Sequence, residues 1–375
     1  MSIKTLSKKM LAIVAAGAMT LGLAMPTSVF AADEGTTTTV KEAYISKTFN
    51  TVIGKNETFS FKAKPVTGNT AEVTIPSISF SDSDTGSTTK RAQVTFPKWP
   101  DAGKYEYTVT ETAATPAITG EHQKMIMSLA EYTMDVYVTN GDSGLEIANI
   151  IVNKTKDDKG TSATGKVDIS DTDKNGFNFT NTYAQEAGTG TDPTKPDPTY
   201  TTDGSLNVTK KINANGGTLD TKKAFDFTAT FTFPKGTDAT TLGGVKGADG
   251  NKISIGEDGT YKFTLTANGN MKFTGVPVGT QISVVESATP NYKGSAESVF
   301  NGQKQTPVEA SKYNTAFNVA NTLGQNQNKV DVTNTYDYVP TTGIIMNTLP
   351  YVLMIALCGA ALMAFVAFKR SRLQK

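Results

Sequence analysis

The stretch Tyr132-Thr133-Met134-Asp135-Val136-Tyr137-Val138 indicates the fold class of this chain, because apolar and polar residues alternate along it. Alternation with a period of two, in residues that are mostly aromatic or β-branched, is typical of a half-buried β-strand. Similar runs occur at 105–109 and 224–231, and clusters of Gly, Asn, Asp and Pro separate them. Only the two ends of the chain have a long helical pattern. We therefore expect an all-β protein built of antiparallel sandwiches.

The strands occur as two similar sets, which indicates two copies of one structural unit. Each set begins with an alternating run that contains a lysine. A Phe-x-Phe strand and a strand that ends in glutamate follow, and each set closes on a Thr-Asn-Thr-Tyr sequence. The matching segments are 44–49 and 206–212, 59–61 and 225–227, 107–111 and 282–286, and 179–183 and 332–336.

Residues 184–204 separate the two sets and contain three prolines without any apolar period. A polar segment rich in proline is typical of a semi-rigid linker. We therefore expect one immunoglobulin-like sandwich at 40–183 and a second at 205–338.

Each set contains a lysine and an asparagine that strand alternation turns toward the core. Lys47 shares a face with Ile45 in the first set, and Lys210 shares a face with Val208 in the second. The corresponding asparagines of the last strands are Asn181 and Asn334. Lys211 adjoins Lys210, so the choice between these two lysines rests on strand parity. The alternative is ordinary strand chemistry, since lysine is common on edge strands and asparagine in turns.

An inward lysine is unusual, because burial without a partner penalises its charged form. A neutral lysine amine is a nucleophile, and an asparagine side-chain amide is an electrophile when its oxygen is polarised. A carboxylic acid that burial keeps protonated supplies that hydrogen bond and carries protons. Glu111 and Glu286 are the candidate acids. The expected products are an amide that joins lysine to asparagine, and ammonia.

The N-terminal residues predict a secretory signal peptide at 1–31. Three lysines precede an apolar run from Met10 to Met25, and small residues follow it. This is the order of the basic, apolar and cleavage regions of a signal peptide. Cleavage is expected after Ala31, so the protein is expected outside the cell.

The C-terminal residues 339–375 resemble the cell-wall sorting signal of Gram-positive surface proteins. Val339-Pro340-Thr341-Thr342-Gly343 resembles the pattern Leu-Pro-x-Thr-Gly, with valine in place of the usual leucine. The run 344–368 is apolar and long enough to span a bilayer as a helix, and the basic residues after it favour a cytoplasmic end. The alternative is an ordinary single-pass anchor. With the motif, the membrane helix is expected to be only a transient holder before cleavage.

Composition excludes several classes of function. The net charge of +1 gives no basic surface for nucleic acid. Cys358 is the sole cysteine and lies in the apolar tail, so no disulfide is expected. His122 is the sole histidine, and we expect no metal and no cofactor. The segment 171–176 imitates the start of a calcium loop, but Thr182 stands where a bidentate glutamate is needed.

Taken together, the chain resembles the two-domain backbone pilins of Gram-positive bacteria, whose CnaB-like domains carry self-formed Lys–Asn isopeptide bonds. The resemblance implies the bond Lys47–Asn181 with Glu111, and the bond Lys210–Asn334 with Glu286. It also implies polymerisation by a pilus-type sortase, which cuts after Thr342 and transfers the acyl group to a neighbouring copy. A housekeeping sortase would then attach the fibre to peptidoglycan, and minor pilins are further expected partners.

The lysine that accepts the acyl group is predicted to be Lys174, which lies in a polar turn just before the last strand of the first domain. Its alternative role is a solvated turn residue. The Tyr-Pro-Lys motif of many pilins is absent, and Phe96-Pro97-Lys98 is a superficial match. Lys98 is therefore the second choice.

We expect a structural shaft subunit on the cell surface rather than an enzyme. The alternative is a wall-anchored adhesin or minor pilin built of the same domains, but the two repeats and the linker leave no room for a ligand-binding domain. Trp99 could be an exposed binding residue, although core or turn packing is the simpler interpretation. With one histidine, a Ser/His/Asp triad has little support.

Overall fold

The computed structural model describes residues 40–337, except 67, 168 and 170–175, together with residues 351–366. Within these residues the secondary structure is β-strand, apart from a short helix α1 and a helix at 351–366. The all-β prediction is therefore confirmed. Several predicted features lie outside the described residues: the signal peptide with Ala31, the motif Val339, Pro340, Thr341, Thr342 and Gly343, and Lys174.

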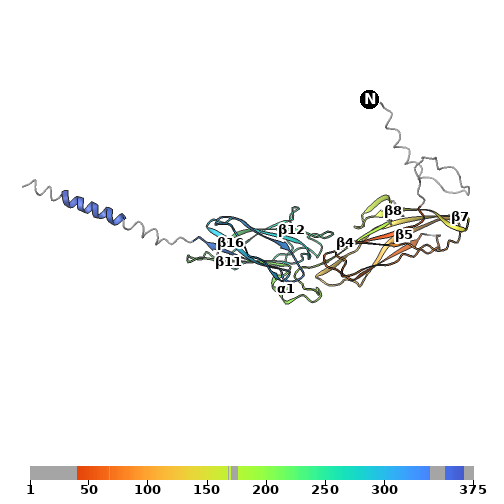
Figure 1. Ribbon diagram of the computed structural model, residues 1–375, viewed down its shortest axis with the longest axis horizontal. Helices are drawn as coiled ribbons and strands as arrows, with labels where there is room; N and C mark the ends of the chain where they lie inside the picture. The colour runs from red at the N-terminus through yellow and green to blue at the C-terminus, as the bar shows by residue number, and fades with distance from the viewer. Residues whose placement is uncertain (1–39, 67, 168, 170–175, 338–350, 367–375) are drawn as a thin grey trace, which may run out of the picture. The chain divides into compact units, whose positions relative to one another are not determined.

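The first sandwich has two sheets around one core (Figure 1). One sheet has the order β4-β1-β10-β6 and the other the order β3-β2-β5-β7-β8-β9. The strands are β1 (Tyr44–Thr51), β2 (Glu57–Pro65), β3 (Ile78–Phe80), β4 (Gly86–Gln93), β5 (Gly103–Thr115), β6 (Gln123–Ile126), β7 (Glu131–Gly141), β8 (Gly144–Lys156), β9 (Ser162–Val167) and β10 (Phe177–Gln185).

The second sandwich repeats this plan around a separate core. One sheet has the order β14-β11-β20-β16-β17, with β18 paired to β16, and the other has the order β13-β12-β15-β19. The strands are β11 (Leu206–Asn213), β12 (Phe225–Thr232), β13 (Thr260–Leu265), β14 (Asn270–Phe273), β15 (Gln281–Glu286), β16 (Tyr292–Phe300), β17 (Gln303–Lys304), β18 (Val308–Glu309), β19 (Phe317–Thr322) and β20 (Lys329–Tyr336).

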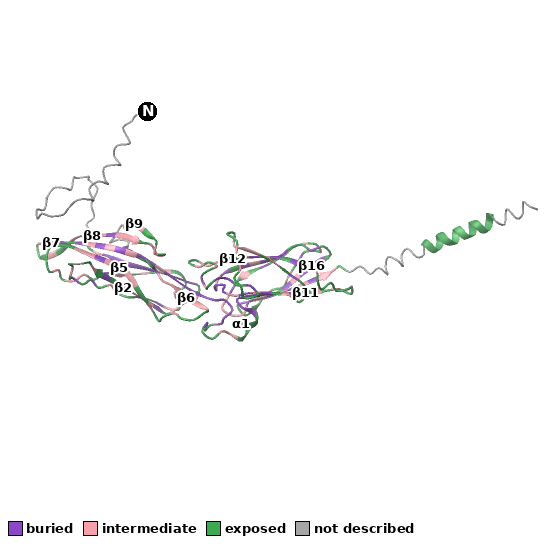
Figure 2. Ribbon diagram, turned by 180° about the vertical axis from the view of Figure 1, so that it is seen from behind, coloured by how far each residue is buried: buried purple, intermediate pink, exposed green. Residues whose placement is uncertain are grey.

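Alternation along the strands builds both cores. The stretch quoted first lies in β7, where Tyr132, Met134, Val136 and Val138 are buried and the residues between them are more exposed. Figure 2 shows buried residues, in purple, running along the strands of each sandwich. This pattern is the one expected when one face of each sheet packs on the other sheet.

The first and last strands of each sandwich are neighbours and run parallel. In the first sandwich β1 pairs with β10, and Lys47 lies opposite Phe179. In the second, β11 pairs with β20, and Lys210 lies opposite Val332. Parallel pairing requires a long connection between the two strands, and here the rest of each sandwich supplies it. Each pair thus brings the two ends of its domain together.

The Pro-rich segment 184–204 is folded rather than extended. Ala187 is fully buried in the core of the second sandwich, and its N–H donates to the carbonyl of Val276 at 2.9 Å. Gly188 has φ +81, and a Cβ there would lie 2.2 Å from the carbonyl oxygen of Gly204. Helix α1 (Pro198–Asp203) ends the segment, directly before β11. The composition of the segment did not indicate this packing, because its buried residues are few and are not regularly spaced along the sequence.

The helix at 351–366 is exposed along its described length. Among the described residues, no helix has both the length and the apolar character needed to cross a membrane. The predicted span, 344–368, includes residues on both sides of 351–366 that the structure does not describe.

Candidate functional site: a lysine, a glutamate and an asparagine in each core

Strand β1 carries Lys47 into the core of the first sandwich. Its side chain is 0% exposed, as is that of Glu111. The Nζ atom lies 4.3 Å from the centre of the Phe59 ring, so the amine is surrounded by apolar groups. A lysine in such a place needs a specific partner.

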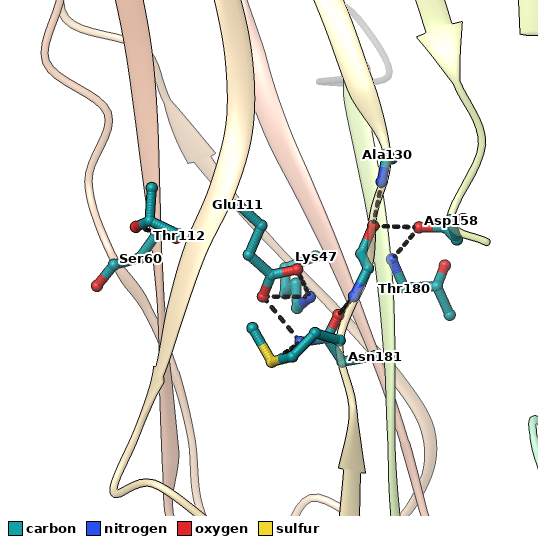
Figure 3. Close-up of polar contacts among 10 residues, drawn as sticks. Lys47, Ser60, Glu111, Thr112, Ala130, Asp158, Thr180 and Asn181 are labelled. Atoms are coloured by element: carbon teal, nitrogen blue, oxygen red, sulfur yellow. Dashed lines mark hydrogen bonds and ion pairs between the residues drawn. The ribbon is translucent and has the colours of Figure 1, made fainter. Parts of the chain in front are cut away.

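Glu111 reaches the same place from the opposite sheet, on β5. A β-bulge accompanies it: Phe61 pairs with Glu111 and Ser60 pairs with Ala113, so Thr112 is the extra residue. The Thr112 hydroxyl donates to the Ser60 carbonyl at 3.1 Å (Figure 3). Bulges are common next to functional sites, since they redirect side chains locally.

The three predicted side chains of the first sandwich are in contact (Figure 3). Lys47 Nζ lies 2.9 Å from both oxygens of Glu111. Asn181 Nδ2 donates to Glu111 Oε1 at 2.8 Å. Asn181 is 0% exposed and lies on β10, which pairs directly with β1. One glutamate thus bridges the amine and the amide.

The second sandwich contains the same arrangement. Lys210 Nζ lies 2.8 Å from Glu286 Oε2 and also donates to Asn334 Oδ1. Asn334 Nδ2 donates to Glu286 Oε1. All three residues are at most 2% exposed. Lys211 is exposed, so strand parity selected the inward lysine.

Burial shifts both members of each ion pair toward their neutral forms. Desolvation lowers the pKa of Lys47 and that of Lys210 to about 8, against the opposing effect of the neighbouring carboxylates. Desolvation also raises the pKa of Glu111 and that of Glu286. A proton that passes from lysine to glutamate gives a neutral amine beside a carboxylic acid. This pair can attack an amide and protonate the nitrogen that leaves.

Comparison with protein families finds a match for each sandwich. Residues 43–184 match the family described as the Spy0128-like isopeptide containing domain. The match covers the first sandwich. The match confirms, for the first sandwich, the resemblance to the isopeptide-containing pilins of Gram-positive bacteria. Residues 204–336 match a family described as a domain of unknown function, DUF7601.

Among solved structures, the chain is similar to the major pilin of Streptococcus pyogenes, with 19% identity over 79% of this chain and 98% of that one, at a TM-score of 0.32. The T-13 major pilin of the same organism is also 19% identical, over 80% and 98%, at a TM-score of 0.30. A pilus-presented adhesin, Spy0125 (Cpa), is 16% identical over 55% and 35%, at a TM-score of 0.26. A comparison with curated protein sequences found no match.

Two contacts in the first sandwich were not expected from the sequence. The backbone N–H of Ser128 donates to Asn181 Oδ1 at 2.7 Å, and Met127 Sδ lies 3.3 Å from Asn181 Nδ2. Both residues belong to the loop between β6 and β7. The expected hydrogen bond from glutamate to the amide oxygen is not the one observed, because both glutamates contact the amide nitrogen. A loop residue that acts through its backbone leaves no signal in residue type or spacing.

Trp99 packs inside the first sandwich. Its ring lies 4.6 Å from that of Tyr105 and packs against the first core. Of the two interpretations from the sequence, packing in the core or a turn therefore describes Trp99 better than an exposed binding residue does.

Proposed function

We propose that the chain is the shaft subunit of a covalently polymerised surface pilus, whose two sandwiches are each closed by an autocatalytic Lys–Asn isopeptide bond. The observation that carries the proposal is the repeated triad. Lysine and asparagine stand on the first and last strands of each sandwich, with a buried glutamate between them. A covalent cross-link in each sandwich suits a subunit that carries load along a fibre, which favours a shaft over an adhesin or a minor pilin.

The bond-forming step is balanced without any cofactor. The neutral amine of Lys47 attacks Cγ of Asn181, and the amide oxygen takes the negative charge of the tetrahedral intermediate. Glu111, as the carboxylic acid, donates its proton to Nδ2 and then takes a proton from the attacking nitrogen, so it ends the step protonated as it began. The C–N bond of the side-chain amide breaks, ammonia leaves, and an amide joins the two residues. The same step applies to Lys210, Glu286 and Asn334. Each site reacts once, so the protein is not an enzyme in the usual sense.

Polymerisation is the second part of the proposal. A pilus-type sortase is proposed to cut between Thr342 and Gly343 and to hold the chain as a thioester through Thr342. Transfer to Lys174 of another copy gives a head-to-tail linkage, which generates an open filament. A housekeeping sortase is proposed to transfer the last subunit to peptidoglycan on the Gram-positive cell surface, after release from a transient membrane anchor. Minor pilins would complete the fibre.

A denaturing gel of cell-wall extracts tests the polymerisation. The expected result is a ladder of high-mass species that collapses to a monomer in Lys174→Ala and persists in Lys98→Ala. A single wild-type band would refute the shaft role and favour the wall-anchored adhesin or minor pilin. A ladder that is lost in Lys98→Ala instead would move the linkage to the second-choice lysine.

Intact-mass measurement tests the internal bonds separately. The wild-type mature chain is expected to lack the mass of two ammonia molecules. Glu111→Ala and Glu286→Ala are each expected to lack only one. A wild-type mass equal to that of the unmodified sequence would end the isopeptide proposal, whatever the gel shows.

A further inference from the structure

The loop before β7 presents a backbone donor to the reacting amide of the first sandwich. Ser128 is 5% exposed, and its N–H lies 2.7 Å from Asn181 Oδ1. A backbone N–H can only donate, so the atom that faces it must be the amide oxygen. The nitrogen of Asn181 therefore faces Glu111. Oxygen and leaving group are held apart by two different partners before any reaction begins.

Asp158, in the turn between β8 and β9, forms hydrogen bonds with Ser128 and with Thr180, the residue that precedes Asn181 (Figure 3). Its Oδ1 accepts a hydrogen bond from the Ser128 hydroxyl at 2.5 Å and another from the Thr180 N–H at 2.8 Å. Thr180 directly precedes Asn181 on β10. In addition, the Leu129 N–H donates to the Asp158 carbonyl at 3.0 Å. One residue thus ties the donor loop to the strand that carries the acceptor.

The second sandwich lacks this arrangement within the part of the chain that the structure describes. There Asn334 Oδ1 accepts from the Lys210 amine itself, and no backbone donor to that oxygen is found among the described residues. The two sites share the lysine, the glutamate and the asparagine, and they differ in what faces the amide oxygen.

We propose that the Ser128 N–H is the oxyanion donor of isopeptide formation in the first sandwich, and that Asp158 is the positioning residue that holds it in place. The inference rests on the proposed isopeptide chemistry. When Lys47 attacks Cγ, the negative charge develops on Oδ1, where a fixed dipole already points. A preorganised donor at such a position stabilises the transition state more than the ground state, because it does not have to reorient. Asp158 does not touch the reacting atoms. It acts through its hydrogen bonds with Ser128 and Thr180, and, beside the larger effect of desolvation, its negative charge also raises the pKa of Lys47 and that of Glu111.

The test follows both bonds over time in one molecule. The mature chain, residues 32–342, is refolded from denaturant after isolation from inclusion bodies, and samples are digested at intervals. The joined peptide that contains Lys47 and Asn181 reports the first bond, and the one that contains Lys210 and Asn334 reports the second. Trp99 is the only tryptophan and lies in the first sandwich, so its fluorescence reports folding of that sandwich separately.

Asp158→Ala is expected to slow the first bond by at least about tenfold, since loss of one oxyanion donor costs enzymes about 10²–10³ in rate. The second bond and the Trp99 folding signal should keep their wild-type rates. Asp158→Asn keeps an oxygen acceptor for Ser128 and Thr180, and it should restore most of the first-bond rate. Ser128→Ala keeps the N–H but loses the link to Asp158, and an intermediate rate is expected.

Each contrary result has a definite meaning. A first bond that forms at the wild-type rate in Asp158→Ala overturns the inference and leaves the isopeptide proposal intact. Equal slowing of both bonds, or of bond formation and Trp99 folding together, assigns Asp158 a purely structural role and also overturns it. If the wild type forms no first bond under these conditions although Trp99 shows folding, the proposed chemistry itself fails.

Discussion

At the scale of single residues, each site places a lysine and a glutamate where neither charge is well solvated. Separating a buried lysine from its partner leaves an uncompensated charge, which is strongly destabilising. Conversion of the pair to an amine and a carboxylic acid removes both charges, and formation of an amide makes the change permanent. Burial of the two charged groups is unfavourable, and it therefore promotes the reaction, because it favours the neutral lysine amine and the protonated glutamate that react.

The protonation states predict a bell-shaped dependence of bond formation on pH. The reactive pair, Lys47 with Glu111, holds a single proton. In acid the pair gains a second proton, and the nucleophile becomes an ammonium group. Well above the Lys47 pKa of about 8, the pair loses its proton and Glu111 can no longer protonate the leaving nitrogen. The rate at which the joined Lys47–Asn181 peptide forms, measured at pH 5, 7.5 and 10, should be highest at pH 7.5. A rate that keeps rising to pH 10 would remove the acid role of Glu111.

Glu57 is a buried carboxyl outside the two sites, and it predicts a pH effect on stability. It is 2% exposed, and neither of its oxygens has a hydrogen-bond partner in the described residues. Desolvation raises its pKa to about 7. The pKa of Glu57 is higher in the folded protein than in the unfolded chain. Its contribution to the free energy of unfolding is therefore fully present below about pH 4.5. It is lost as the pH rises through 7. At pH 8 the loss is on the order of 3 kcal/mol, at about 1.4 kcal/mol per tenfold change.

Urea unfolding of the wild type and of Glu57→Gln, at pH 5 and pH 8, measures this effect. The difference in unfolding free energy between the two pH values should shrink in the variant, since glutamine does not ionise. The absolute stability of the variant matters less, because a buried amide has its own desolvation cost. An unchanged pH difference would show that Glu57 ionises in the folded protein without penalty.

At the scale of elements, the sequence predicted the strands that carry the triads, and the structure explains why. Strand alternation in a two-layer sandwich decides which side chains face the core, so parity alone placed Lys47 and Lys210 inward. The bulge at Thr112 and the loop at Ser128 could not be predicted, because each depends on how non-adjacent segments meet. The folded segment 184–204 was missed for the same reason. Its buried N–H groups bond to distant residues: that of Ala187 donates to the carbonyl of Val276, and that of Gly188 donates to the carbonyl of Gly324.

The pairing of β1 with β10 predicts the thermal effect of losing one bond. The Lys47–Asn181 bond closes a loop of more than about 100 residues, which the chain-entropy treatment of cross-links values at roughly 4–5 kcal/mol. Asn181→Ala should lower the midpoint of thermal unfolding of the first sandwich by at least about 10 °C. Asn178→Ala changes an exposed residue of the same strand and serves as the control. Equal midpoints for the wild type and Asn181→Ala would mean that the bond does not stabilise the fold.

At the scale of the whole molecule, the proposed bonds lie close to the points where the chain enters and leaves each sandwich. Lys47 is in the first strand and Asn181 in the last strand of the first sandwich, and Lys210 and Asn334 hold the same places in the second. Thr342, the proposed acyl end, follows Asn334 by only a few residues in the sequence. A force applied between the two ends of the mature chain would therefore pass through the two bonds, and the residues between each lysine and its asparagine would carry little of it.

Single-molecule stretching of the mature chain, tethered at both ends, tests this load path. The wild type is expected to show no unfolding step of either sandwich before the tether fails. In Asn181→Ala the first sandwich can unfold, and its roughly 130 bypassed residues should add about 450 Å of length, at about 3.5 Å per extended residue. Asn334→Ala should release a slightly shorter length from the second sandwich, and Asn178→Ala should behave as the wild type does. A step of about 450 Å in the wild type would show that load crosses the sheets rather than the bond between Lys47 and Asn181.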